Sequence, residues 1–196
     1  MQKPFLILAP LLAAPLAGCI SFSPKPPPEL LTLTSAAALP VGETQKSNSS
    51  STITIGIPAA AQELASNRVP VRSGGTAVAY VKDAQWVEPP SRLFARLLAD
   101  TITAQTGRVV LSYRQSRLDP GAQLTGELRA FGIDEETSEA VVTYDASLMR
   151  GADPVFEKRR FEARAPVAKI DSDNVGPALN QAANKVAAEV AEWVGK

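Results

Sequence analysis

The residues of this sequence that could do chemistry are carboxylates, serines and a single thiol, because the chain has no histidine and only one cysteine. Without histidine, Ser-His-Asp and Cys-His catalysis and histidine metal ligation are excluded. The acidic groups at 134–136 and at Asp171 and Asp173 lack the opposed carboxylates of a hydrolase and the glycine turn of a calcium loop. The sequence therefore predicts no catalytic residue and no metal site, and the protein is not expected to be an enzyme.

The cysteine has a more specific setting. Cys19 follows Leu16, Ala17 and Gly18, and small residues before a cysteine resemble the bacterial lipobox, whose thiol receives diacylglycerol. The apolar run from Phe5 to Leu16 would rise about 18 Å as a helix, too short for a hydrocarbon core of about 30 Å. We expect cleavage between Gly18 and Cys19, with diacylglycerol and an N-acyl chain on Cys19 and no other cofactor. The alternative is a plain secretory signal with an accidental cysteine.

Three segments are expected along the chain. They are a lipoprotein signal peptide at 1–18, the lipidated cysteine with a proline-rich tether at 19–28, and one periplasmic domain at 29–196. Two or three acyl chains anchor a protein stably to a membrane. Ile20 stands where an aspartate retains many Gram-negative lipoproteins in the inner membrane. The sequence therefore predicts an outer-membrane protein that faces the periplasm.

Composition limits the size of the domain and the kind of partner. The 196 residues suit one ordinary domain, and their 45% hydrophobic content is typical of a globular core. Lysine and arginine number 20, as do aspartate and glutamate. A nucleic-acid partner is not expected, because phosphate binding needs a clustered basic excess.

The apolar spacing predicts one α+β domain. One helix should begin at Pro89 or Pro90 and end at Gly107, and a second should span 171–194 with Ser172 or Asp173 as its cap. Apolar and polar residues alternate along the expected strands, which predicts a sheet with one face in the core and the other in solvent. Ala130 is expected among the core-facing positions of its strand. We expect a mixed or antiparallel sheet with both long helices packed on one face. The expected strands are 29–34, 52–57, 68–72, 76–81, 108–113, 123–133, 140–148 and 155–165.

Several stretches then resemble a known family. They read TITIGIP, NRVPVRSGG and WVEPPSRLFARLLADTIT, and the most specific part is 68–98. This order resembles the ABC-type transport auxiliary lipoproteins, although Pro90 stands where the family usually has leucine and 44–51 is unusually polar. The resemblance implies a non-enzymatic accessory subunit, lipid-anchored in the periplasm, that docks the assembly to the outer membrane. Its implied partners are an ABC transporter and a mammalian-cell-entry-type protein that move phospholipids or other hydrophobic molecules.

Four residues of that stretch are candidate partner contacts. Arg68 and Arg72 could meet an acidic partner or a lipid phosphate, or could be isolated surface arginines. Trp86 could be an interface hot spot, but a tryptophan just before a helix more often packs on the core. Glu88 is as well suited to the helix N-terminus, where negative charge is favourable.

Two other functions remain open from the residues. A lipoprotein adaptor or activator of peptidoglycan synthesis, secretion or pilus assembly would use the same lipid, tether and small domain. Direct lipid binding would require an apolar pocket between helix and sheet. The oligomeric state is not predicted.

Overall fold

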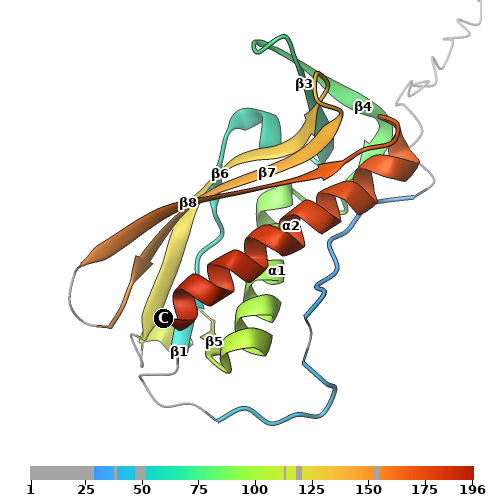
Figure 1. Ribbon diagram of the computed structural model, residues 1–196. Coiled ribbons are helices and arrows are strands. Elements are labelled where there is room, and N and C mark those ends of the chain that lie inside the picture. The colour runs from blue at the N-terminus through green and yellow to red at the C-terminus, as the bar shows by residue number, and fades with distance from the viewer. Residues whose placement is uncertain (1–28, 38, 47–51, 113, 118–120, 152–154) are drawn as a thin grey trace, which may run out of the picture.

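The computed structural model describes residues 29–37, 39–46, 52–112, 114–117, 121–151 and 155–196. The expected signal peptide, the cleavage site at Gly18 and Cys19 and the tether lie outside these residues. The strands of the described chain form one twisted sheet, and both long helices pack on the same face of it (Figure 1). The α+β class and the placement of the helices are therefore confirmed.

The sheet is mixed and is organised around its longest strand, β6 (Ala122–Asp134). One edge of β6 pairs in parallel with β1, β2 and β3 in turn, and the other edge pairs antiparallel with β7. The remaining pairs are β1 with β5 in parallel, and β3 with β4 and β7 with β8 antiparallel. The bounds of these strands are β1 Thr52–Ile55, β2 Ala59–Ala60, β3 Arg68–Ser73, β4 Ala77–Gln85, β5 Val109–Leu111, β7 Glu139–Met149 and β8 Phe156–Pro166, with short 3-10 helices at Gln62–Leu64 and Gln115–Arg117.

The two α-helices begin and end for local reasons. Helix α1 (Pro90–Thr106) starts at a proline and ends at Gly107, whose φ of 68° is left-handed, as the sequence predicts. Helix α2 (Ser172–Gly195) is capped by Asp171, whose carboxylate accepts the Asn174 N–H at 3.1 Å. The expected caps Ser172 and Asp173 are wrong, because both already lie inside the helix. No helix in the described part of the chain is long and apolar enough to cross a membrane.

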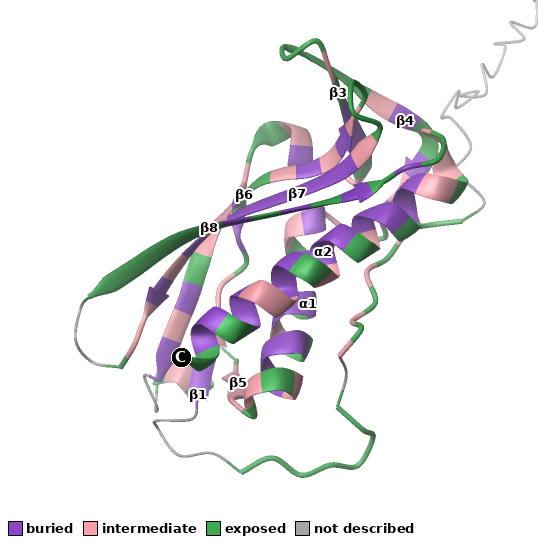
Figure 2. Cartoon of the chain, in the orientation of Figure 1, coloured by how far each residue is buried: buried purple, intermediate pink, exposed green. Residues whose placement is uncertain are grey.

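The core lies between the helices and the sheet, where the buried residues gather (Figure 2). At its centre the Phe94 ring meets the Tyr144 ring edge-on at 5.3 Å, and the buried Tyr144 hydroxyl donates to the Thr125 carbonyl at 2.8 Å. Burial raises the pKa of Tyr144. A Cβ on Gly126 would lie 2.2 Å from the Asp145 carbonyl oxygen, so only glycine fits against β7 there.

Two expectations about the strands are wrong. A register shift between Leu128 and Ala130 reverses the alternation of β6, which turns Phe131 and Ile133 into the core. Ala130 consequently lies half-buried on the outer face, where it lines a surface hollow. The strand expected at 29–34 is reduced to one isolated bridge between Leu31 and Trp86.

Candidate partner-binding surface

The first described residues form a strap, residues 31–37, that runs from the end of β4 onto the helices. The Leu31 N–H donates to the Gln85 carbonyl at 2.7 Å, and the Leu31 carbonyl accepts the Val87 N–H at 2.9 Å. The Leu31 side chain lies against Gly176 of α2, where a Cβ would come within 2.8 Å of it. The strap therefore fixes where the chain joins the domain, near the N-terminal end of α2 (Figure 1).

Two asparagines one helical turn apart hold the rest of the strap. The Thr34 N–H donates to Asn180 Oδ1 at 2.9 Å, and the Ala36 N–H donates to Asn184 Oδ1 at 2.7 Å. Asn184 Nδ2 donates in return to the Thr34 carbonyl at 2.9 Å. These side chains satisfy backbone groups as a neighbouring strand would, which explains why residues after Leu31 follow α2 rather than the sheet.

The substitution Asn184→Ala is expected to loosen the strap while the domain stays folded. It removes the two hydrogen bonds that Asn184 makes to the strap, each contributing about 0.5–1.5 kcal/mol. It also removes the bond from Asn184 Nδ2 to the Asn180 carbonyl, a loss that the higher helix propensity of alanine offsets. Hydrogen exchange at the Thr34 and Ala36 amides should accelerate, with a fall in unfolding free energy of no more than about 3 kcal/mol. Lys185→Ala is the matched control, because Lys185 is exposed and has no bond to the strap. Equal exchange in both variants would show that the asparagines do not hold it.

The candidate arginines lie at the two ends of β3. The Arg68 guanidinium stacks 3.8 Å from the centre of the Tyr80 ring, and Arg68 lies opposite Gln85 of β4. Arg72 pairs with Glu63, and 52% of its side chain is exposed. Both guanidinium groups therefore have intramolecular partners and also reach solvent, where they remain candidate partner contacts.

Trp86 belongs to the core rather than the surface. It is fully buried, and its ring meets Phe131 edge-on at 5.5 Å. The indole N–H has no acceptor among the described residues, and a buried donor without a partner costs about 1–3 kcal/mol. The core interpretation of Trp86 is confirmed. Glu88, two residues further, pairs with Arg96 of α1 and is partly exposed.

The outer face of the sheet, which neither α1 nor α2 covers, carries a hollow of about 200 Å³. Its floor includes Ala130, Gly132 and Val141. The Glu63–Arg72 pair borders it, and Arg164 of β8 lies across from them. The hollow is small and charged at its rim, which suits a polar contact better than an acyl chain.

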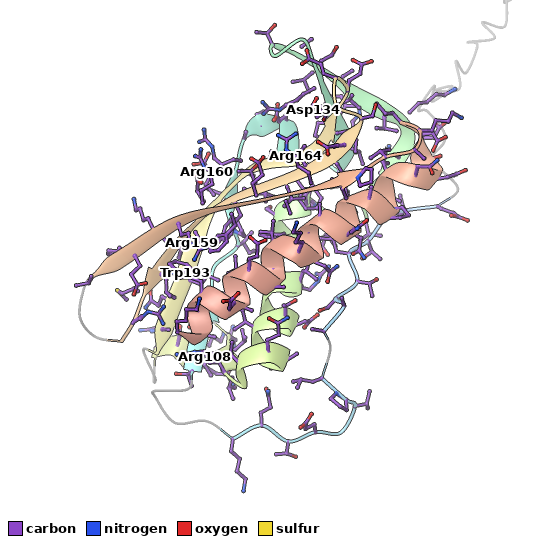
Figure 3. All side chains as sticks on the ribbon, viewed as in Figure 1. Arg108, Asp134, Arg159, Arg160, Arg164 and Trp193 are labelled. Carbon is purple, nitrogen blue, oxygen red and sulfur yellow. The ribbon has the colours of Figure 1, made fainter. Side chains whose placement is uncertain are left out.

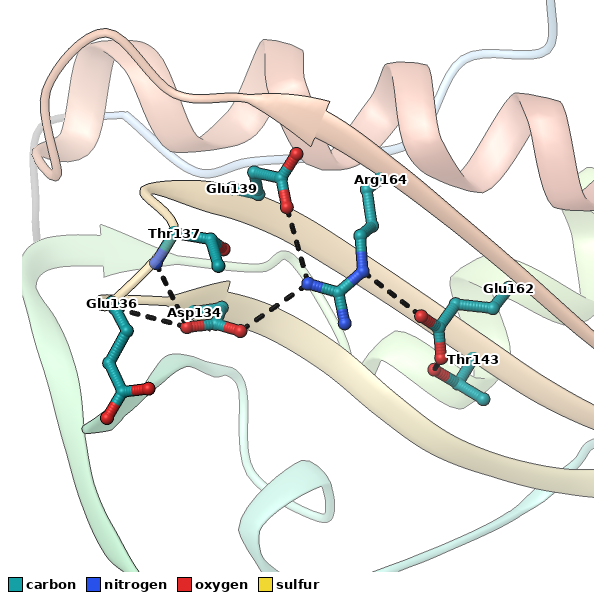
Figure 4. A network of polar contacts seen from close by, with 7 residues as sticks. All are labelled: Asp134, Glu136, Thr137, Glu139, Thr143, Glu162 and Arg164. Carbon is teal, nitrogen blue, oxygen red and sulfur yellow. Dashed lines mark hydrogen bonds and ion pairs between the residues drawn. The ribbon is translucent and has the colours of Figure 1, made fainter. Parts of the chain in front are cut away.

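Arg164 joins three strands at that rim (Figure 4). Its guanidinium lies 3.1 Å from Glu162, 3.3 Å from Glu139 of β7 and 3.5 Å from Asp134 of β6. Glu162 also accepts the Thr143 hydroxyl at 2.9 Å. Hydrogen bonding to Glu162 first, and then to Glu139 and Asp134, raises the pKa of Arg164, so it stays charged.

A second ion pair lies further along the outer face. Arg160 donates from Nε and Nη2 to the two carboxylate oxygens of Asp145, at 2.6 and 2.7 Å. The hydrogen bond from Arg160 lowers the pKa of Asp145. These contacts bind β8 to β7 through side chains as well as backbone. The alternation of β8 placed Arg160 and Arg164 on the polar face, but their partners on other strands gave no sequence signal.

The described residues contain no group of three or more histidine, cysteine, aspartate or glutamate side chains placed to hold a metal ion. Of the candidate contacts, Arg68 lies near the Trp86 end of β4, whereas Arg72 lies toward the β3–β4 turn. The candidates thus do not converge on one site. The surface features of the described residues are a strap, a polar sheet face and paired charges.

Comparison with known proteins identifies the family. Residues 32–191 match the family model described as "ABC-type transport auxiliary lipoprotein component". No curated protein matches the chain. A crystal structure of a Xanthomonas campestris protein from the DUF330 family is similar, with a TM-score of 0.68 and 20% identity over 85% of this chain and 94% of that one. A crystal structure titled as an uncharacterized protein has a TM-score of 0.62 and 16% identity over 85% of this chain and 99% of that one.

At these identities the two crystal structures support the fold alone. The family match says more, because it covers residues 32–37 of the strap, all of α1, every strand of the described residues and α2 as far as residue 191. The chain therefore belongs to the family of ABC-type transport auxiliary lipoprotein components.

Proposed function

We propose that this protein is the lipid-anchored accessory subunit of an ABC transporter that moves phospholipids or other hydrophobic molecules between the inner and outer membranes. It sits on the outer membrane through the acyl chains of Cys19 and docks the periplasmic assembly there. A mammalian-cell-entry-type protein is its direct partner. The observation that carries the proposal is the family match over 32–191.

The geometry of the domain supports a role in docking. The strap ties the start of the described chain to β4 and α2, so the point at which the expected tether joins is fixed on the folded body. The outer face of the sheet offers a charged hollow to a protein partner. Arg68 and Arg72 are available for such a contact, whereas the buried Trp86 supports β4 and α1 from within.

Co-purification tests the proposal. The full-length protein, tagged at its C-terminus, is extracted from membranes in mild detergent, and its stoichiometric partners are identified by mass spectrometry. We expect a mammalian-cell-entry-type protein together with a permease and an ATPase. The matched control carries residues 1–28 in front of an unrelated periplasmic domain, so that it shares only the anchor.

The outcomes separate the functional classes. Recovery of the transporter by this protein and not by the control supports the proposal. Recovery of peptidoglycan synthases or of secretion or pilus components would contradict it and favour the adaptor function. Arg68→Glu and Arg72→Glu then test the candidate contacts. Both side chains are exposed, so their replacement should not disturb the packing of the core.

A further inference from the structure

Strand β8 leaves one edge of the sheet open. Among the described residues it pairs only with β7, along its full length from Phe156 to Pro166. Helix α2 packs under the half of β8 that contains the buried Phe161, Ala163 and Ala165. The outward backbone groups of this edge have no strand partner among the described residues, and such an edge can pair with an added strand.

The first half of β8 extends beyond the body of the domain. Residues 156–160 are exposed on both faces, and the projecting end is continuously exposed in Figure 2. Its tip carries two exposed apolar side chains, Val155 at 68% and Phe156 at 59%. A projecting edge with apolar residues at its tip is a favourable place for a protein contact.

This projecting segment carries positive charge that is only partly compensated, because Arg159 interacts with the Glu192 carboxylate of α2 beyond ion-pair distance. Arg160 is held by Asp145, but neither Lys158 nor Arg159 has a carboxylate within ion-pair distance among the described residues. Arg159 stacks instead 4.9 Å from the Phe161 ring, which itself contacts Trp193 (Figure 3). The two cations follow each other in an extended strand, so they point to opposite faces of the sheet.

The β7–β8 hairpin is also held in place next to its turn. Arg150, just after β7, donates to the Trp193 and Val194 carbonyls at 3.0 and 3.1 Å, and to Glu157 at 2.7 Å. It thereby joins the hairpin to the C-terminal end of α2. A helix of 24 residues is about 36 Å long, and the strap starts against Gly176 near its other end and runs to Asn184 near its middle. The open edge consequently projects away from the end where the anchor joins.

We infer that the open edge of β8 binds an extended, acidic segment of the periplasmic partner, which adds to the sheet as a further strand. Backbone hydrogen bonds would supply the pairing, and acidic residues next to Lys158 and Arg159 would set its register. A second copy of this chain fits less well, because antiparallel pairing of two edges through 158–160 brings like charges together. This inference rests on the proposed function.

The test uses the full-length protein and the purified transporter complex with its mammalian-cell-entry-type protein. Affinity is compared for the wild type, for Lys158→Glu with Arg159→Glu, and for the control pair Lys82→Glu with Lys185→Glu. Both control lysines are exposed, and the control changes net charge equally. The β8 pair should weaken binding by about tenfold or more, and more strongly at low salt. Lys158→Glu alone, which keeps the Arg159–Phe161 contact, should show part of the effect.

Hydrogen exchange gives an independent readout. In the complex, amides of β8 on the open edge should exchange more slowly than in the free protein. Equal affinity of the β8 and control pairs, or no added protection of β8, would overturn the inference and leave the proposed function standing. Failure of the wild type to bind the complex at all would overturn both.

Discussion

Replacing Cys19 by serine is expected to abolish fatty-acid attachment and to remove the protein from the outer membrane. A serine hydroxyl is a much weaker nucleophile than a cysteine thiol at neutral pH. The acyl chains are the expected anchor, and each buried CH₂ contributes about 0.8 kcal/mol to membrane binding. Incorporation of labelled palmitate should fall to background, and sucrose-gradient fractions of the outer membrane should lose the protein.

Two further variants accompany Cys19→Ser, one as a matched control and one to separate lipid attachment from cleavage of the signal segment. Ser21→Ala leaves the Leu16–Cys19 motif unchanged and should be labelled and sorted like the wild type. The uncut Cys19→Ser chain keeps its apolar segment, so a second form carries a general secretory signal in place of residues 1–18. That form should be soluble in the periplasm. Labelling of Cys19→Ser, or its retention in the outer membrane, would contradict the assignment of Cys19 as the anchor.

The substitution Trp86→Ala is expected to destabilise the domain by about 3–5 kcal/mol. The side chain is fully buried and packs against Phe131, and its backbone holds Leu31 of the strap through the isolated bridge. Domains of this size are stable by only about 5–15 kcal/mol. Urea unfolding followed by circular dichroism should therefore show a much lower midpoint.

Two variants separate packing from recognition. Trp86→Phe keeps an aromatic ring and removes the indole N–H that has no acceptor among the described residues. Its unfolding free energy should therefore fall clearly less than that of Trp86→Ala. Val87→Ala changes a neighbour that is 46% exposed and should alter stability by no more than about 0.5 kcal/mol. A Trp86→Ala protein that unfolds like the wild type but no longer binds the transporter would instead make Trp86 an interface residue.

Most of the fold could be predicted from the sequence, because the strongest sequence signals are local. Helix α1 follows from Pro90, the apolar spacing and Gly107, all within one segment. The long strands β6, β7 and β8 follow from alternation and short turns. The mixed topology is harder to predict, because β1, β2 and β3 share one edge of β6 through contacts far apart in the chain.

The errors have a different physical origin. The alternation of Leu31 and Leu33 fits a strand, but Asn180 and Asn184 direct this segment onto α2 from about 150 residues away. The register shift beside Ala130 changes which residues of β6 face the core. Its local signal is the change of the large apolar residues from even positions, Leu124 and Leu128, to the odd positions of Phe131 and Ile133.

The candidate site was less predictable than the fold. The sequence identified the two arginines of β3 as candidate contacts, but their intramolecular partners could not be predicted because they depend on tertiary contacts. Arg164 meets carboxylates from two neighbouring strands as well as its own. The open edge of β8 becomes apparent only when the order of strands is known, since the same charged run also suits a paired strand.

Transfer of lipid between two vesicle populations tests the central claim most directly. One population holds the ABC transporter with its mammalian-cell-entry-type protein, and the other carries this protein through acylated Cys19. The proposal predicts ATP-dependent transfer of a fluorescent phospholipid that requires the anchored protein and is lost with the soluble, unanchored form. Equal transfer with the anchored protein, with the unanchored form and with neither would contradict a role as the accessory subunit that docks the transporter to its target membrane.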